Sequence, residues 1–105
     1  MTVVDMHTHF LPETWPDLSQ TIGGTDWPWM RHDGPGRAML MLGDKEFRPV
    51  QEACWNSDKR LEDMDRDGVD IQIMCATPLL FGYQRPLQHA IQNAQLFNDL
   101  ALELC

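Results

Sequence analysis

Two strand-like segments alternate with two helix-like segments, and this alternation constrains the fold more than any other feature of the sequence. Strands are predicted at residues 2–9 and 69–75, where successive residues alternate between two faces in the way typical of a β-strand. Helices are predicted at about 57–67 and 86–104, where apolar residues recur at helical spacing. Strands that alternate with amphipathic helices are typical of parallel βα units. The sequence therefore predicts an α/β fold.

Both predicted helices carry signals at their ends. Asn56 or Ser57 is expected to cap the first helix, and Gly68 is expected to end it. Pro86 suits the first turn of the second helix. The apolar spacing predicts the following inward-facing residues: Leu61 and Met64 in the first helix, and Leu87, Ala90, Ile91, Ala94, Phe97, Ala101 and Leu104 in the second.

The segment between the first strand and the first helix is too long for a simple connection. It is rich in Gly, Pro and Trp as far as residue 37, and we expect about residues 10–50 to form an insertion or lid. Within it, residues 38–50 predict a β-hairpin that turns at Gly43-Asp44.

Two βα units cannot close a sheet, because their edge strands would remain unpaired. The apolar pattern of the second helix also continues to Cys105 without a Gly or Pro stop signal. We therefore expect residues 1–105 to be the N-terminal part of a larger domain.

The charge of the chain argues against two classes of partner. Sixteen acidic and eight basic residues give a net charge of −8, whereas nucleic acids and anionic membranes require a basic surface. No apolar run approaches the roughly 20 residues of a membrane span, and no signal peptide is visible. The three cysteines are far apart and form no CxxC pair. We expect a soluble, cytoplasmic protein.

The sharpest chemical signal is Asp5-Met6-His7-Thr8-His9 in the first strand. Residues i and i+2 of a strand face the same way, so His7 and His9 are predicted to converge on one metal ion, with Asp5 on the same face to orient a histidine. The alternative is a pair of polar histidines on an exposed strand. The end of the first strand of a βα unit favours the metal site, because barrel active sites lie there.

A catalytic metal needs at least three protein ligands, and the remaining histidines offer none at a suitable spacing. His32 lies in the glycine-rich insertion and His89 lies beside the apolar stripe of the second helix. For both, an ordinary structural role is the favoured interpretation. The other metal ligands are therefore expected outside this chain.

Arg48, in Phe47-Arg48-Pro49-Val50, is the second candidate site residue. It could be an ordinary surface arginine in a salt bridge. However, its neighbours Phe47 and Pro49 restrict it, and an acidic protein that acts on an acidic substrate needs a local guanidinium to bind a carboxylate. The sequence leaves both interpretations open.

Several longer motifs resemble one family. DMHTHFLP (5–12), FRPV (47–50) and RLEDMDRDGVDIQIMCATPLLFGY (60–83) are similar to the N-terminal segment of the 2-amino-3-carboxymuconate-6-semialdehyde decarboxylases, in the amidohydrolase superfamily. NDLALE (98–103) is a weaker match. DMHTH marks only the superfamily, whereas the other two long motifs narrow the resemblance to the decarboxylases.

The resemblance implies a distorted (β/α)₈ TIM barrel with a small insertion after its first strand. It also implies one Zn²⁺ ion, held by His7 and His9 together with a histidine and an aspartate outside this chain. A further histidine outside the chain would be the acid/base group, so no catalytic residue is assigned here. By the same resemblance, Arg48 binds a substrate carboxylate, and Phe47 lies beside it.

The implied reaction is the non-oxidative decarboxylation of a small acidic substrate in the tryptophan–kynurenine pathway, by an enzyme that is a homodimer when full length. The 105 residues alone are expected to be inactive. Two alternatives remain: another metal-dependent aromatic-acid decarboxylase or hydrolase of the same superfamily, and a truncated fragment without catalytic activity.

Overall fold

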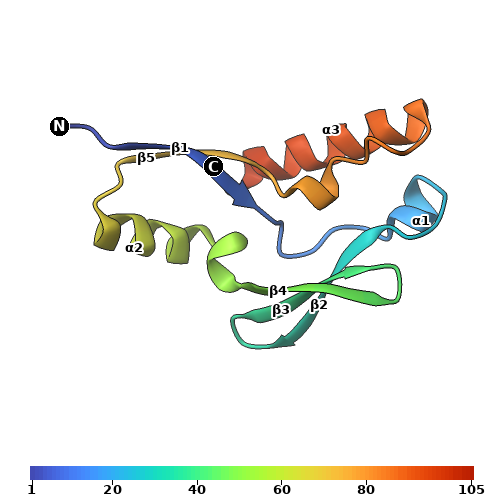
Figure 1. The fold of residues 1–105 in the computed structure, drawn as a ribbon, viewed down its shortest axis with the longest axis horizontal. Coiled ribbons are helices and arrows are strands. Elements are labelled where there is room, and N and C mark those ends of the chain that lie inside the picture. Colours follow the sequence, from blue (N-terminus) through green and yellow to red (C-terminus); the bar gives the residue numbers. More distant parts are fainter.

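The computed structural model describes residues 1–105, which form two separate β-sheets and three α-helices (Figure 1). In chain order the elements are β1 (Val4–Phe10), α1 (Leu18–Thr21), β2 (Pro28–Gly34), β3 (Arg37–Leu42), β4 (Lys45–Gln51), the 3₁₀-helix η1 (Glu52–Cys54), α2 (Ser57–Asp67), β5 (Ile71–Ala76), the 3₁₀-helix η2 (Pro78–Leu80) and α3 (Leu87–Leu104). β1 pairs with β5, and β3 lies between β2 and β4. The predicted α/β class is confirmed.

The two-stranded sheet is parallel, as the alternation of strands and helices predicts. Val4 pairs with Ile71 at one end of the sheet, and Phe10 pairs with Ala76 at the other. The register shifts between Asp5 and Thr8, so that β1 has one residue more than β5 in this interval. This β-bulge interrupts the strict alternation expected for residues 2–9, because an extra residue changes the face on which the following side chains lie.

The predicted ends of α2 are confirmed. The side chain of Asn56 accepts hydrogen bonds from the backbone N–H groups of Asp58, at 3.0 Å, and Lys59, at 3.2 Å. Asn56, rather than Ser57, is therefore the N-cap. At the other end Gly68 has a φ of 71°, in the left-handed region, and closes the helix.

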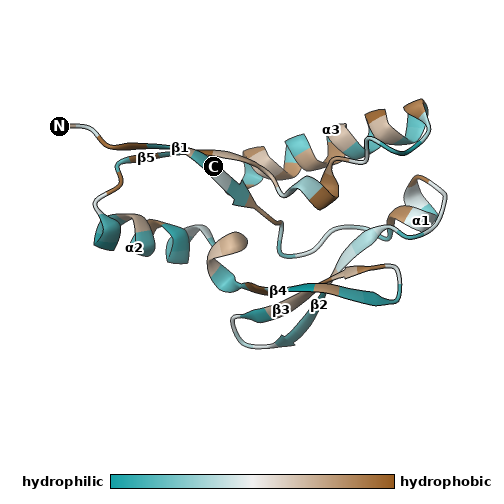
Figure 2. Cartoon of the chain, viewed as in Figure 1, coloured by the Kyte–Doolittle hydropathy of each residue, from teal (hydrophilic) through white to brown (hydrophobic).

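The predicted inward face of α2 is wrong at one position. Leu61 is 56% exposed. The helix instead directs the guanidinium of Arg60 toward β1, where it donates to the carbonyl of His9. Figure 2 shows that α2 is hydrophilic over most of its length, so a polar contact rather than an apolar stripe sets its rotation.

The predicted inward face of α3 is also partly wrong. Leu87 is 73% exposed and Ile91 is 42% exposed, whereas Asn93 and Phe97 are buried. The side chain of Asn93 donates to the carbonyl of Leu80 at 2.6 Å, and α3 must turn this amide inward to make that bond. The apolar spacing alone could not reveal it.

The insertion between β1 and α2 contains a three-stranded antiparallel sheet. Its β3–β4 hairpin turns at Gly43-Asp44, as predicted, because Leu42 pairs with Lys45. β2 was not predicted from the sequence, and it precedes a second tight turn around Gly36, where φ is 70°. The insertion is therefore a folded sheet over much of its length.

The main apolar core lies between this antiparallel sheet and α3. It consists of Leu11, Leu18, Trp27, Ala38, Leu40, Val50, Leu80 and Phe97. Arg85 fastens the insertion to the segment before α3, because its guanidinium lies 3.8 Å from the ring centre of Trp27 and donates to the carbonyl oxygens of Thr25 and Asp26. The insertion and α3 thus form one packed unit.

The parallel sheet, by contrast, has an open apolar face. Val4, Met6, Ile71 and Ile73 are each at least 41% exposed. Apolar side chains on a parallel strand are normally covered, since parallel sheets are buried on both faces. None of the helices combines the length and apolarity that crossing a bilayer requires.

Gly68→Ala is expected to lower the free energy of unfolding by about 1 kcal/mol, because only glycine adopts a positive φ without strain. No atom lies within 4 Å of the position that a Cβ would take, so the effect comes from the backbone conformation alone. Gly68→Asn should cost less, since asparagine tolerates this conformation better than alanine. Urea denaturation measures both changes, and an alanine variant as stable as the wild type would contradict a left-handed cap.

Candidate functional site

The C-terminal end of β1 is held by hydrogen bonds from three neighbouring segments. The carbonyl of His9 accepts from Nη2 of Arg60 at 3.0 Å. The carbonyl of Phe10 accepts from the backbone N–H and the Oγ1 of Thr77, at 3.1 and 3.0 Å. The backbone N–H of Leu11 donates to the carbonyl of Cys54 at 3.0 Å. The backbone that carries the candidate metal ligands is therefore fixed on several sides.

His7 and His9 lie together at this end of β1. Their ring centres are 4.8 Å apart and their planes meet at 82°. His7 is exposed and His9 is half-buried. The ring of His7 makes no hydrogen bond, and that of His9 makes one, through Nδ1 to Sγ of Cys75 at 3.2 Å. Each ring therefore retains a nitrogen that can bind a ligand.

Asp5 does not lie where the sequence predicts. Asp5 pairs with Gln72 and Thr8 pairs with Met74, whereas His9 pairs with Cys75. Paired residues share a face, so the bulge puts Asp5 on the opposite face of the sheet from His9. Its Oδ1 accepts a hydrogen bond from the backbone N–H of His7 at 3.3 Å, and this bond stabilises the bulge. The carboxylate makes no hydrogen bond with the imidazole of His7 or His9.

The two imidazoles fit a zinc ion in part. Imidazole nitrogen is a preferred zinc ligand, and two neighbouring rings with free nitrogens supply half of a four-coordinate site. No group of three or more His, Cys, Asp or Glu side chains in the chain is arranged to hold a metal ion.

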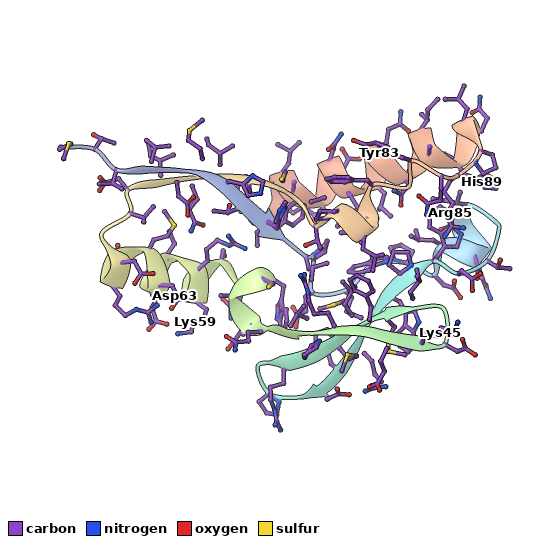
Figure 3. All side chains as sticks on the ribbon, in the orientation of Figure 1. Lys45, Lys59, Asp63, Tyr83, Arg85 and His89 are labelled. Carbon is purple, nitrogen blue, oxygen red and sulfur yellow. The ribbon has the colours of Figure 1, made fainter.

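The other two histidines have ordinary structural contacts. Nε2 of His32 lies 2.7 Å from the carbonyl of Glu13, and its ring stands edge-on to Trp55. His89 lies near Arg85, beside the segment that follows α1 (Figure 3). Neither joins a group of metal-ligating side chains with His7 and His9.

Phe47 and Arg48 lie on β4, in the other sheet. Arg48 pairs with Leu40, whereas the next residue of β3, Met41, pairs with Glu46. Phe47 is therefore the extra residue of a second β-bulge, and its side chain is 54% exposed. Neither Phe47 nor Arg48 makes a side-chain hydrogen bond or ion pair with the histidines of β1.

Arg48 differs from Arg31, on β2, in having no acidic partner. Arg31 forms ion pairs with Asp33 and with Glu46, each at 2.8 Å. The hydrogen bonds that the Arg31 guanidinium donates to these two carboxylates raise its pKa, and the bond to Asp33 lowers the pKa of that carboxyl group. Arg48 is exposed and forms no ion pair, so its charge remains available to an anion.

A cavity of about 420 Å³ opens elsewhere in the insertion. Three tryptophans line it, together with Asp17 and Asp26. The indole N–H groups of Trp15, Trp27 and Trp29 all donate to backbone carbonyls, so the rings act as packed walls. None of the predicted site residues lines this cavity.

Two residues at the site escape prediction from the sequence. Arg60 occurs in a helix segment rich in acidic residues, where an arginine is normally a solvated ion-pair partner. Cys75 contacts His9 only because β1 and β5 pair in one particular register. Strand pairing is not encoded locally, so no sequence signal marks either residue.

The chain is similar in sequence to decarboxylases from three organisms. It is 38% identical over 96 residues to the 2-amino-3-carboxymuconate-6-semialdehyde decarboxylase of Dictyostelium discoideum. The aligned residues are 91% of this chain and 27% of that protein. The match to the Caenorhabditis elegans protein of the same name is 30% over 102 residues, or 97% of this chain and 25% of that protein. The chain is a relative of these decarboxylases. It spans about a quarter of the length of these two relatives.

Two further comparisons bear on the fold and the family. The decarboxylase of the same name from Sus scrofa is 41% identical over 49 residues, which are 47% of this chain and 36% of that protein. The crystal structure of Metarhizium anisopliae IDCase in apo form superposes with a TM-score of 0.66 at 22% identity, over 99% of this chain and 31% of the other. This likeness shows a shared fold. No family model matches the chain.

Arg31→Gln is expected to raise the pKa of Asp33 toward its ordinary value, because the guanidinium that stabilises the carboxylate is removed. Carboxyl ¹³C NMR over a pH titration measures the change. Arg48→Gln is the matched control and should leave the pKa of Asp33 unchanged. A comparable shift in the control would mean that Arg48 belongs to the same ion-pair network.

Proposed function

We propose that residues 1–105 are the N-terminal part of a zinc-dependent enzyme that decarboxylates 2-amino-3-carboxymuconate 6-semialdehyde in the tryptophan–kynurenine pathway. The observation that carries this proposal is the adjacent pair His7 and His9 at the C-terminal end of a parallel strand, in a chain related to decarboxylases of that name. Active sites of βα barrels lie at this end of the strands.

The proposed architecture is a distorted (β/α)₈ barrel with an insertion after its first strand. The parallel pairing of β1 with β5 supports it, since a barrel of this kind contains only parallel strands. The exposed side chains of Val4, Met6, Ile71 and Ile73 supply an apolar face that further strands and side chains of a barrel would cover. We assign residues 10–50 to the insertion or lid.

His7 and His9 would hold the zinc ion, and the remaining ligands and the acid/base histidine would come from the rest of the enzyme. Bound zinc acts as a Lewis acid in such sites. The chain's own contribution is to fix the two imidazoles, through the anchored backbone at His9 and the bulge braced by Asp5. Residues 1–105 alone are inactive in this proposal, because two ligands do not complete a site.

Arg48 would bind a carboxylate of the substrate, with Phe47 beside it. The net charge of −8 repels an acidic substrate, so a fixed cation is needed where the substrate binds. Arg48 pairs across the sheet with Leu40, and Val50 pairs with Ala38, so Arg48 lies on the face of the sheet that carries the core residues. From that face it can reach toward the interior of the enzyme.

The full-length enzyme is proposed to be a cytoplasmic homodimer. All three cysteines are free, which suits a reducing compartment. The proposal includes no nucleic-acid or membrane partner, on the ground of the acidic charge balance.

His9→Ala or His7→Ala in the full-length protein should remove most of the bound zinc and the activity. Since both ligands serve one ion, the double variant should be little worse than either single variant. His89→Ala is the matched control and should retain zinc. Atomic absorption measures the zinc content, and about one zinc per chain in His9→Ala would place the metal elsewhere.

Arg48→Ala should lower kcat/KM by about 30-fold to a few thousandfold, the equivalent of losing a desolvated charge pair of roughly 2–5 kcal/mol. Zinc content should not change. Arg48→Lys should recover only part of the loss, because an ammonium group cannot form the two parallel hydrogen bonds of a guanidinium. Steady-state kinetics tests this, with Arg37→Ala as the control. A kcat/KM within about threefold of wild type in Arg48→Ala would contradict substrate binding.

A further inference from the structure

We propose that Cys75 is a positioning residue that holds the imidazole of His9 in the tautomer and orientation needed to bind the metal. The inference rests on the proposed function of His9 as a ligand. The observation that supports it directly is the contact of 3.2 Å between Sγ of Cys75 and Nδ1 of His9.

The direction of this hydrogen bond follows from a second contact of the same sulfur. Sγ of Cys75 also lies 3.5 Å from the carbonyl oxygen of Thr8. A carbonyl oxygen can only accept, and we infer that the single hydrogen of the thiol is donated to Thr8. With the hydrogen on that side, the sulfur presents its lone pairs to His9, and Nδ1 of the ring is the donor.

The tautomer of His9 follows from this arrangement. A neutral imidazole carries one proton, and a donating Nδ1 takes that proton. Nε2 of His9 then keeps its lone pair and is the nitrogen able to bind a metal. Metal-binding histidines commonly donate their other ring nitrogen to a fixed acceptor, which orients the ring and increases its basicity.

The register of the sheet makes the contact a fixed one. His9 and Cys75 are partners on neighbouring strands, and the carbonyl of His9 is anchored by Arg60 on the other side. The acceptor is therefore on a short side chain whose place beside His9 is set by the register of β1 and β5. His7 has no such partner, because the carboxylate of Asp5 is bonded to its backbone N–H.

Cys75 contributes little to the core. Its side chain lies on the exposed face of β5 and belongs to no buried cluster. Substitution of Cys75 should therefore change the histidine without unfolding the protein, which separates a positioning role from a structural one.

The experiment compares Cys75→Ala and Cys75→Ser with the wild type in the full-length protein. Long-range ¹H–¹⁵N NMR of the zinc-free protein, labelled at histidine, distinguishes the two tautomers of His9. The wild type should carry the proton on Nδ1, and Cys75→Ala should lose this preference. Cys75→Ser should keep it, because a hydroxyl group can donate to Thr8 and accept from His9 in the same way. Cys105→Ala is the matched thiol control.

Zinc affinity, measured by competition with a chelator, provides the second readout. Cys75→Ala should bind zinc about 10- to 100-fold more weakly, and Cys75→Ser should remain near the wild type. An unchanged tautomer and affinity in Cys75→Ala would overturn the inference. So would a thiolate-to-metal absorption band in the cobalt-substituted wild type, since Cys75 would then be a ligand itself.

The two proposals fail in different ways. If the wild-type protein binds no zinc, the metal assignment of His7 and His9 fails, and with it the purpose of the Cys75 contact. If zinc binds normally and the tautomer does not depend on Cys75, only the positioning role fails.

Discussion

One guanidinium joins the elements on which the candidate site depends. Arg60 extends from α2 and donates to the carbonyl of His9 and to the side chain of Gln72, both at 3.0 Å, with Cys54 a longer contact at 3.5 Å. It thereby connects β1, β5 and the turn before α2. An arginine carries five N–H donors in a rigid plane, so one side chain can satisfy acceptors from several segments. The parallel sheet has little buried apolar surface of its own, and this polar contact fixes α2 against it.

Features that depend on neighbouring residues along the chain were predictable from the sequence. The cap at Asn56, the end of α2 at Gly68 and the turn at Gly43-Asp44 all follow from the conformational preferences of a few adjacent residues. The rotations of the helices were not predictable, and Leu61 and Leu87 are exposed against expectation. Their rotations are set by hydrogen bonds from Arg60 and Asn93 to carbonyls distant in sequence, and hydrophobic spacing carries no information about such bonds.

In the candidate site, too, local features were predictable from the sequence and features that depend on strand pairing were not. The adjacency of His7 and His9 was predictable, because residues two apart on a strand are near one another whatever the strand pairs with. The expected role of Asp5 was wrong, because a bulge in β1 depends on its pairing with β5. The contact of Cys75 with His9 depends on the same register and was equally hidden. The role of Arg48 in binding a substrate stays a prediction.

The β-bulge at Phe47 places the charges of Glu46 and Arg48 on different faces of the sheet. In an uninterrupted strand, Glu46 and Arg48 would stand on one face, close enough to neutralise one another. Their partners Met41 and Leu40 are adjacent in β3 and point to opposite faces, so the extra residue sends the carboxylate and the guanidinium to opposite sides of the sheet. Glu46 joins Arg31 on its own side. The number of residues in β4, and not only their identity, therefore leaves Arg48 without an internal counterion.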